Sequence, residues 1–205
     1  MNVCIIDYGL GNLSSVKNAV LSLGHGVQIS NKEGEIDAAS HLILPGVGSF
    51  HSGMRGLVDN NLVDILNYQV IEKQKKILGI CLGMHLFSDV GYENDRCPGL
   101  GWIGGEVVKL SNQNGNLRVP HIGWNDIEIS NPSILLTNAS EDLTFYFVHS
   151  YHFVPKDSSM ITAFCDYSEK FAAVIEHKNI FATQFHPEKS QSIGQLVLTN
   201  FLKKK

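Results

Sequence analysis

The chain has 205 residues, of which 43% are hydrophobic and 18% are charged, so its composition is that of an ordinary globular protein. This length accommodates one large domain or two small ones. The net charge of −4 argues against nucleic acid as the main partner, because phosphate binding needs a basic surface.

The cysteines lie far apart in the sequence, at Cys4, Cys81, Cys97 and Cys165. This spacing fits neither a zinc site nor a disulfide framework. A strand pattern begins at Val3, which leaves no signal-peptide pattern, and no apolar run approaches the ~20 residues that span a bilayer. We therefore expect a cytoplasmic protein with reduced thiols, no metal or cofactor and no membrane association.

The first half of the chain alternates strand and helix patterns. Buried strands are expected at 3–7, 26–30 and 41–44, and a fourth strand ends at Cys81. Between them, one helical face carries Leu13, Val16, Val20 and Leu23, and a second helical pattern covers 57–71. Repeated units of this kind indicate a parallel sheet covered by helices on both faces.

The second half changes to shorter strands, and no linker separates it from the first half. Strands are expected at 106–110, 127–130, 145–149, 161–165, 172–176 and 180–184, followed by a helix at 191–202. The sequence therefore predicts one α/β domain over 1–205. Its mostly parallel, doubly wound sheet is flanked by helices and has a β-rich second half.

Cys81 lies between two glycines where a buried strand ends, in the run GICLG at 79–83. This is the pattern of a nucleophile elbow, with cysteine in place of serine. The glycines are expected to permit a sharp turn, and the helix that follows would point its free N–H groups at the sulfur. The alternative is that Cys81 is a small buried hydrophobe, as most free cysteines are.

A catalytic cysteine needs a base and a group that orients the base. His186 and Glu188 follow an apolar strand and flank Pro187, which is expected to hold the segment extended so that both side chains project to one side. Glu188 can then orient one imidazole nitrogen while the other faces Cys81. Taken alone, His186 reads as a histidine at a strand end and Glu188 as a solvated acid.

The run PGVG at 45–48 follows the third strand, at the sheet edge where the fourth strand also ends. Gly46 and Gly48 permit unusual backbone angles and unobstructed N–H groups, which suits an oxyanion hole that includes Val47. The plainer interpretation is a tight turn between a strand and a helix.

These three segments together resemble the class I glutamine amidotransferases, which use a cysteine–histidine–glutamate triad. The runs DYGLGN at 7–12, VPHIGWN at 119–125 and YFVHSY at 146–151 are similar to those of the glutaminase subunits of imidazole glycerol phosphate synthases. The resemblance covers nearly the whole chain. It implies that Cys81 attacks the side-chain amide of L-glutamine, with His186 as acid and base and Glu188 orienting it.

The resemblance also implies the surroundings of this triad. Backbone N–H groups at Val47, Gly48 and Leu82 would hold the oxyanion, and His85, Ser150 and Tyr151 would lie at the substrate site.

A partner protein would receive the ammonia, and in the resembled family it is a (β/α)₈-barrel cyclase subunit of histidine biosynthesis. Asn12, Trp124 and Lys189 are expected at the interface with this partner.

Two positions depart from the family pattern. His85 stands where a glutamine usually helps to hold the substrate, and a histidine is stiffer and can become cationic. Trp102 resembles paralogues that supply ammonia to a sugar amidotransferase synthase subunit in surface-polysaccharide synthesis, and residues 151–152 point weakly the same way. The number of matched motifs favours the histidine pathway.

Two functions of other classes remain for comparison. A stand-alone cysteine hydrolase acting on γ-glutamyl amides would need no partner and would hydrolyse glutamine rapidly by itself. A non-catalytic relative would have a broken triad, and the presence of Cys81, His186 and Glu188 argues against it.

Overall fold

The computed structural model describes residues 2–111, 118–139 and 142–203. The order of elements in the first half is β1 (Asn2–Ile6), α1 (Leu13–Ser22), β2 (Gly26–Ser30), α2 (Glu33–Ala38), β3 (His41–Gly46), α3 (Phe50–Asp59), α4 (Leu62–Asn67), a π-helical turn (Tyr68–Glu72), β4 (Lys76–Cys81) and α5 (Leu82–Leu86). The order in the second half is β5 (Val90–Gly91), β6 (Cys97–Pro98), β7 (Gly105–Lys109), β8 (His121–Ile129), β9 (Thr144–His149), β10 (Tyr151–Pro155), a 3₁₀ turn (Ser158–Met160), β11 (Ile161–Asp166), β12 (Lys170–His177), β13 (Ile180–Thr183), a second 3₁₀ turn (Pro187–Lys189) and α6 (Gln191–Leu202).

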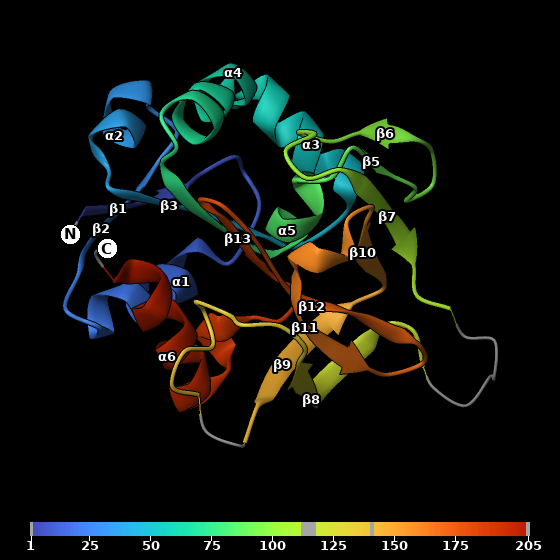
Figure 1. The fold of residues 1–205 in the computed structure, drawn as a ribbon. Coiled ribbons are helices and arrows are strands. Elements are labelled where there is room, and N and C mark those ends of the chain that lie inside the picture. Colours follow the sequence, from blue (N-terminus) through green and yellow to red (C-terminus); the bar gives the residue numbers. More distant parts are fainter. Residues whose placement is uncertain (1, 112–117, 140–141, 204–205) are drawn as a thin grey trace.

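A nine-stranded mixed sheet forms the centre of the molecule, in the order β2-β1-β3-β4-β13-β12-β11-β8-β9 (Figure 1). Strands β2, β1, β3, β4 and β13 pair in parallel, whereas β13, β12, β11, β8 and β9 pair antiparallel. A four-stranded sheet, β10-β7-β5-β6, lies beside it. The α/β class, the parallel first half and the β-rich second half are confirmed, and the second sheet was not expected.

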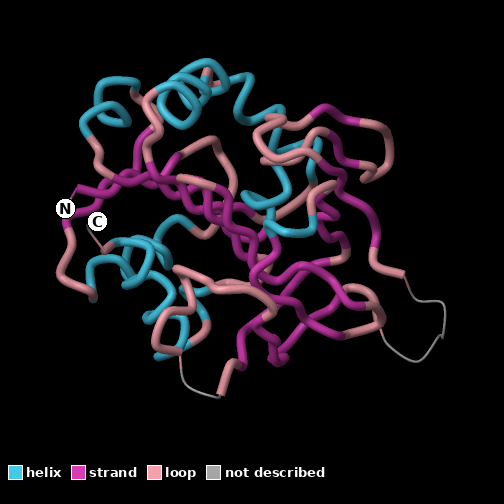
Figure 2. Tube along the Cα trace, in the orientation of Figure 1, coloured by secondary structure: helices cyan, strands magenta, loops and turns pink. Residues whose placement is uncertain are grey.

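Helices cover both faces of the large sheet, as Figures 1 and 2 show. Alternation along β1 explains this arrangement, because successive side chains of a strand point to opposite faces. Val3 and Ile5 pack in the core under α1 and α6, whereas Cys4 and Ile6 pack in the core under α2, α3 and α4. The doubly wound layout therefore follows from a strand that is buried on both faces.

Several boundaries differ from the sequence expectations. Strand β3 continues through Pro45 and Gly46, which pair with Ile80 and Cys81 of β4, so half of the PGVG run belongs to the sheet. The helical pattern over 57–71 is divided, because Asn61 has a φ of 56° and left-handed backbone ends a right-handed helix. Elements α2, β5 and β6 were not predicted because each is short, and β10 was not predicted although it is as long as β1.

Strands β9 and β10 are separated by Ser150 alone, and they belong to different sheets. The chain therefore passes from the large sheet to the small one at this residue. Near the end of β9, Val148 O lies 3.8 Å from the Sγ of Cys81, the last residue of β4. None of the described helices combines the length with the apolar composition that a membrane span requires.

Candidate active site

Cys81 is the last residue of β4 and caps α5, with a φ of 53° and a ψ of −107°. Positive φ is rare for a residue other than glycine and stores strain where it persists. The sharp turn presents the sulfur at the mouth of a cavity, and the first N–H groups of α5 follow it directly. This is the backbone arrangement of a nucleophile elbow.

The two flanking glycines serve close packing, which differs from the expected role in turning the chain. A Cβ on Gly83 would overlap the carbonyl oxygen of Leu44, and one on Gly79 would lie 2.6 Å from the ring of Phe87. The positive φ instead falls on Cys81 itself. Both glycines are therefore required because α5 packs directly against β3 and β4.

His186 and Glu188 form a buried pair, with 2.8 Å between His186 Nδ1 and Glu188 Oε1. The expectation of an extended segment is wrong, because Pro187 starts the 3₁₀ turn Pro187–Lys189 and His186 caps it. The turn is held by Ser190, whose hydroxyl donates to His186 O at 2.7 Å and accepts from the N–H of Tyr146 at 3.0 Å. Tight turning, and not strand periodicity, brings the imidazole and carboxylate together.

The second imidazole nitrogen, His186 Nε2, has no hydrogen-bond partner among the described residues in this geometry. Burial disfavours the charged imidazole, but interactions with an ionised Cys81 sulfur and with Glu188 outweigh burial and raise the pKa of His186 to about 10. A protonated imidazole beside a cysteine favours the thiolate, which is the nucleophilic form. The electrostatics therefore suit a thiolate–imidazolium pair.

The expected oxyanion loop lies beside Cys81. Gly46 pairs with Cys81 across β3 and β4, and a Cβ there would overlap the Tyr8 hydroxyl. That hydroxyl donates to Pro45 O at 2.8 Å and so fixes the end of β3. Gly48 follows with a φ of +103°, and no described atom would lie within 4 Å of a Cβ placed on it, which leaves open space above its backbone.

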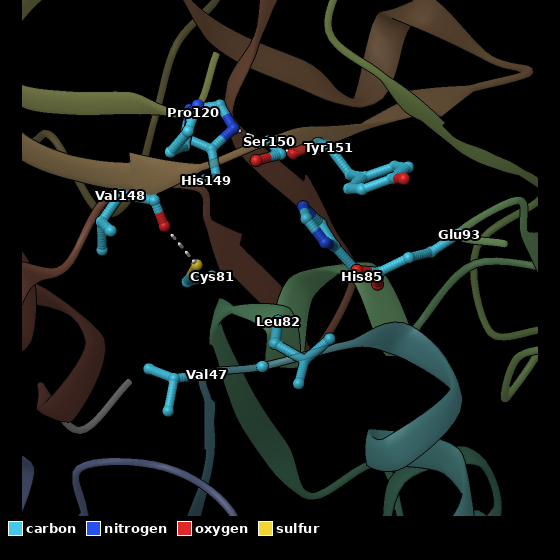
Figure 3. A pocket seen from close by; sticks show the side chains of 11 residues that line it. Val47, Cys81, Leu82, His85, Glu93, Pro120, Val148, His149, Ser150 and Tyr151 are labelled. Carbon is cyan, nitrogen blue, oxygen red and sulfur yellow. Dashed lines mark hydrogen bonds between the residues drawn. The ribbon is translucent and has the colours of Figure 1, made fainter.

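A cavity of about 250 Å³ opens at the sulfur (Figure 3). Most of the predicted site residues line it, namely Val47, Gly48, Cys81, Leu82, His85, Ser150 and Tyr151. Gly46 is not among the lining residues, because it lies within β3 behind them. The structure therefore brings the predicted oxyanion and substrate segments together around one candidate nucleophile.

The sequence interpretation missed Glu93 and His149, which also line the cavity. Glu93 Oε2 accepts from the N–H of Phe50 at 2.6 Å, and nothing in its polar loop distinguishes it in the sequence. His149 was detectable, because it continues the inward-facing alternation of Phe145 and Phe147 in β9. Burial lowers the pKa of His149 to about 2, so it stays neutral near pH 7.

His85 is buried and its Nε2 lies 2.7 Å from Gln184 Oε1. Burial lowers the pKa of His85 to about 4, although the hydrogen bond to Gln184 opposes this shift. The sequence allowed a cationic side chain here, whereas the structure favours a neutral imidazole near pH 7. His85 therefore contributes hydrogen bonding to the cavity without a positive charge.

The three residues expected at a partner interface occupy different settings. The side chain of Trp124 is 49% exposed on β8 and meets the ring of Tyr146 edge-on at 6.0 Å. Lys189 Nζ lies 5.5 Å above the same tyrosine ring, so Trp124 and Lys189 share one surface through Tyr146. Asn12 caps α1, where its side chain accepts from Ser15 N. In the described part of the chain, no group of three metal-ligating side chains is placed to hold a metal ion.

The elbow at Cys81 and the buried His186–Glu188 pair have the arrangement of a cysteine-dependent acyl-transfer site in an α/β fold. The family "Glutamine amidotransferase class-I" matches residues 4–205 of the chain. The chain belongs to this family.

Curated relatives narrow the similarity to one kind of subunit. The chain is 43% identical to the imidazole glycerol phosphate synthase subunit HisH of Pelagibacter ubique, with 98% of this chain and 99% of that protein covered. It is 43% identical to the imidazole glycerol phosphate synthase subunit HisH of Aquifex aeolicus, with 100% of this chain and 97% of that protein covered. It is 42% identical to HisH 2 of Methanococcus maripaludis, with 98% of each chain covered.

Solved structures show the same fold at lower identity. PurLQS from Thermotoga maritima superposes with a TM-score of 0.73 at 20% identity, over 98% of this chain and 97% of that one. A structure described as a glutamine amidotransferase gives a TM-score of 0.73 at 18% identity, over 97% of this chain and 96% of that one.

Proposed function

We propose that this chain is the glutaminase subunit of an imidazole glycerol phosphate synthase, which hydrolyses L-glutamine to glutamate and ammonia and passes the ammonia to a cyclase subunit in histidine biosynthesis. The observation that carries the proposal is the placement of Cys81 at a strained elbow with the buried His186–Glu188 pair. Similarity to HisH subunits over nearly the full length supports the choice of synthase.

The first chemical step is acyl transfer to Cys81. The thiolate attacks the side-chain carbonyl carbon of glutamine, and the negative charge that develops on the oxygen is held by backbone N–H groups at Gly48 and Leu82. The carbon–nitrogen bond then breaks as His186 gives its proton to the leaving amide nitrogen. Ammonia departs and a glutamyl thioester remains on Cys81.

The second step returns the enzyme to its starting state. A water molecule gives a proton to His186 and attacks the thioester carbonyl, and the carbon–sulfur bond breaks to release glutamate. Glu188 keeps the imidazole oriented in both steps, because its Oε1 holds Nδ1 and leaves Nε2 free to exchange the proton. The imidazolium formed in this step is stabilised by the same carboxylate.

The cavity has the size and polarity for one amino acid. Its volume of about 250 Å³ suits glutamine, and its polar walls include Glu93, Ser150 and Tyr151. The carboxylate of Glu93 and the neutral imidazole of His85 are acceptors that suit the substrate's α-ammonium group. We assign these two residues to recognition of the amino-acid end of the substrate.

The proposed partner is a (β/α)₈-barrel cyclase subunit, which binds the surface around Trp124, Tyr146 and Lys189. This surface adjoins the His186–Glu188 turn, so a partner seated there can influence the triad. A closed path between the subunits is required because free ammonia becomes ammonium in water. We further infer that 1–205 form a single glutaminase domain, located in the cytoplasm, where its four unpaired cysteines are kept reduced.

A sugar amidotransferase synthase subunit is the alternative partner. Trp102, which suggested it, donates its indole N–H to Asn67 Oδ1 at 2.7 Å and packs on Phe87. This contact gives Trp102 a packing role at the junction of α4 and α5, so it favours neither partner.

Steady-state glutamine hydrolysis tests the proposal. The chain alone should turn over glutamine slowly, and addition of a barrel cyclase subunit with its acceptor substrate should increase the rate strongly. Cys81→Ser should abolish both rates while leaving partner binding in place. Rapid hydrolysis without a partner would identify a stand-alone hydrolase, and stimulation only by a sugar amidotransferase synthase subunit would identify the alternative pathway.

A further inference from the structure

Gln184 is a fully buried amide that connects the substrate cavity with the candidate nucleophile. It follows β13 and precedes the triad turn, and its backbone N–H donates to Ala173 O at 2.9 Å. Its side chain reaches two groups at once. Gln184 Oε1 lies 2.7 Å from His85 Nε2, and Gln184 Nε2 lies 3.8 Å from Cys81 Sγ.

These contacts determine which atoms carry hydrogens. An amide oxygen only accepts, so His85 Nε2 must bear the proton that it shares with Gln184 Oε1. A neutral imidazole has a single N–H, so the other ring nitrogen of His85 is an acceptor toward the cavity. With its oxygen occupied by His85, the amide of Gln184 directs its N–H group at the sulfur.

The opposite orientation of the Gln184 side-chain amide, with the oxygen and nitrogen exchanged, is excluded on electrostatic grounds when the sulfur is ionised. It would place the partly negative oxygen of Gln184 against the thiolate of Cys81, and it would remove the hydrogen bond that stabilises the negative sulfur. Hydrogen bonds to charged groups are about twice as strong as those between neutral groups. The observed orientation is therefore the one that matches a nucleophilic Cys81.

We propose that Gln184 is a positioning residue, which is held by His85 and donates a hydrogen bond that stabilises the thiolate of Cys81. The inference rests on the proposed function, because it takes Cys81 as the nucleophile. It adds to that function a chain of hydrogen bonds from His85 through Gln184 to Cys81, which we call the relay. Gln184 acts through the sulfur and needs no contact with glutamine.

The relay also accounts for the unusual residue at position 85. Binding of the substrate's ammonium at the free nitrogen of His85 polarises the imidazole, which strengthens its N–H bond to Gln184 and the amide's bond to the sulfur. Occupancy of the amino-acid subsite is thereby linked to the nucleophile. His186 and Tyr8 also interact with Cys81, and no hydrogen bond joins either of them to Gln184 among the described residues.

The test is the rate at which iodoacetamide alkylates Cys81 in the full-length chain across pH, measured by mass spectrometry of the Cys81 peptide. Cys97 is partly exposed and serves as an internal reference within each sample. Gln184→Met keeps the shape of the side chain and removes its N–H group. It should slow alkylation of Cys81 near pH 7 by about 10-fold, with Cys97 unchanged.

Two further variants separate this role from a loss of folding. His85→Met leaves Gln184 unanchored. It should also slow the alkylation of Cys81, by a smaller factor than Gln184→Met does. Asn200→Leu is the matched control, because Asn200 is a buried amide that donates to the carbonyls of Leu135 and Thr137 far from the cavity. It should destabilise the fold and leave the alkylation of Cys81 unchanged.

The outcomes are distinct. Equal Cys81 reactivity in the unaltered chain, Gln184→Met and His85→Met would overturn the relay while leaving the proposed function intact. Slowing in Asn200→Leu of the same size would also overturn it, because a general loss of order would then explain the effect. If Cys81 in the unaltered chain reacts no faster than Cys97, the nucleophile of the proposed function is refuted and the relay with it.

Discussion

His186 Nδ1 and Glu188 Oε1 lie 2.8 Å apart, and each side chain is only 2% exposed. The second carboxylate oxygen, Glu188 Oε2, has no hydrogen-bond partner within the described residues. The charge of Glu188 is therefore directed mainly at one imidazole, and little water screens it. The interactions of His186 with Cys81 and with Glu188 together raise the pKa of the imidazole above neutral pH.

Glu188→Gln should remove that charge and retain the size of the side chain. We expect the pKa of His186 to fall, and kcat for glutamine hydrolysis in the synthase complex to drop by about 100-fold or more, with a smaller effect on KM. NMR titration of the His186 imidazole and steady-state kinetics measure the two effects. Glu72→Gln, at an exposed position outside the site, is the control. An unchanged kcat would show that Glu188 does not orient the base.

The sequence predicted the parallel half of the fold well, because most strands there have an apolar centre and are bounded by turn residues. Helix α6 begins and ends where its pattern does, at Gln191 and Leu202. The elements it missed are short or depend on tertiary partners. Strand β10 is an example, since its pairing with β7 joins residues distant in the sequence.

The candidate site was predicted as far as local motifs extend. The runs around Cys81, Val47 and His186 each carry a recognisable pattern, and the structure places Cys81 and Val47 at one cavity with the His186 turn beside it. Gln184 and Glu93 could not be predicted, because their roles arise from partners that the fold supplies. Gln184 meets His85 across 99 positions, and no spacing rule reports such a contact.

Gly83→Ala tests the claim that close packing fixes the elbow. The new Cβ would overlap Leu44 O in β3, so α5 must move away from the sheet. We expect a loss of about 3 kcal/mol or more in the free energy of unfolding, measured by urea denaturation. Gly34→Ala in α2 is the matched control, because no described atom would lie within 4 Å of its Cβ and alanine favours helix. Equal stability of both variants would contradict the packing argument.

Buried histidines predict a loss of stability in mild acid. Burial, assisted by nearby Lys76, lowers the pKa of His41 from its ordinary value of 6.5 to about 4. Between these two values the unfolded chain binds more protons than the folded one, so stability falls as the pH falls. His41 should contribute up to about 1.4 kcal/mol per pH unit over this window.

His41→Leu should therefore flatten the decline of unfolding free energy between pH 6.5 and 4, as measured by urea denaturation at each pH. His41 packs edge-on against Phe201 at 5.3 Å, so an apolar replacement suits its surroundings. His51→Leu, at an exposed position in α3, is the control for replacing a histidine by leucine. A slope unaffected by His41→Leu would mean that His41 titrates alike in both states.

Trp124→Ala tests the proposed partner surface. The indole is 49% exposed on β8, and it is ordered against Tyr146 beside Lys189, as an anchor for an interface would be. Truncating a central aromatic anchor costs about 2 kcal/mol or more, so the Kd for the cyclase subunit should rise by roughly 30-fold. Isothermal titration calorimetry measures this directly. Tyr68→Ala is the matched control, because Tyr68 is 52% exposed but lies on the π-helical turn, in another part of the fold. A partner that loses affinity with Tyr68→Ala and not with Trp124→Ala would place the interface on the α4 side of the molecule.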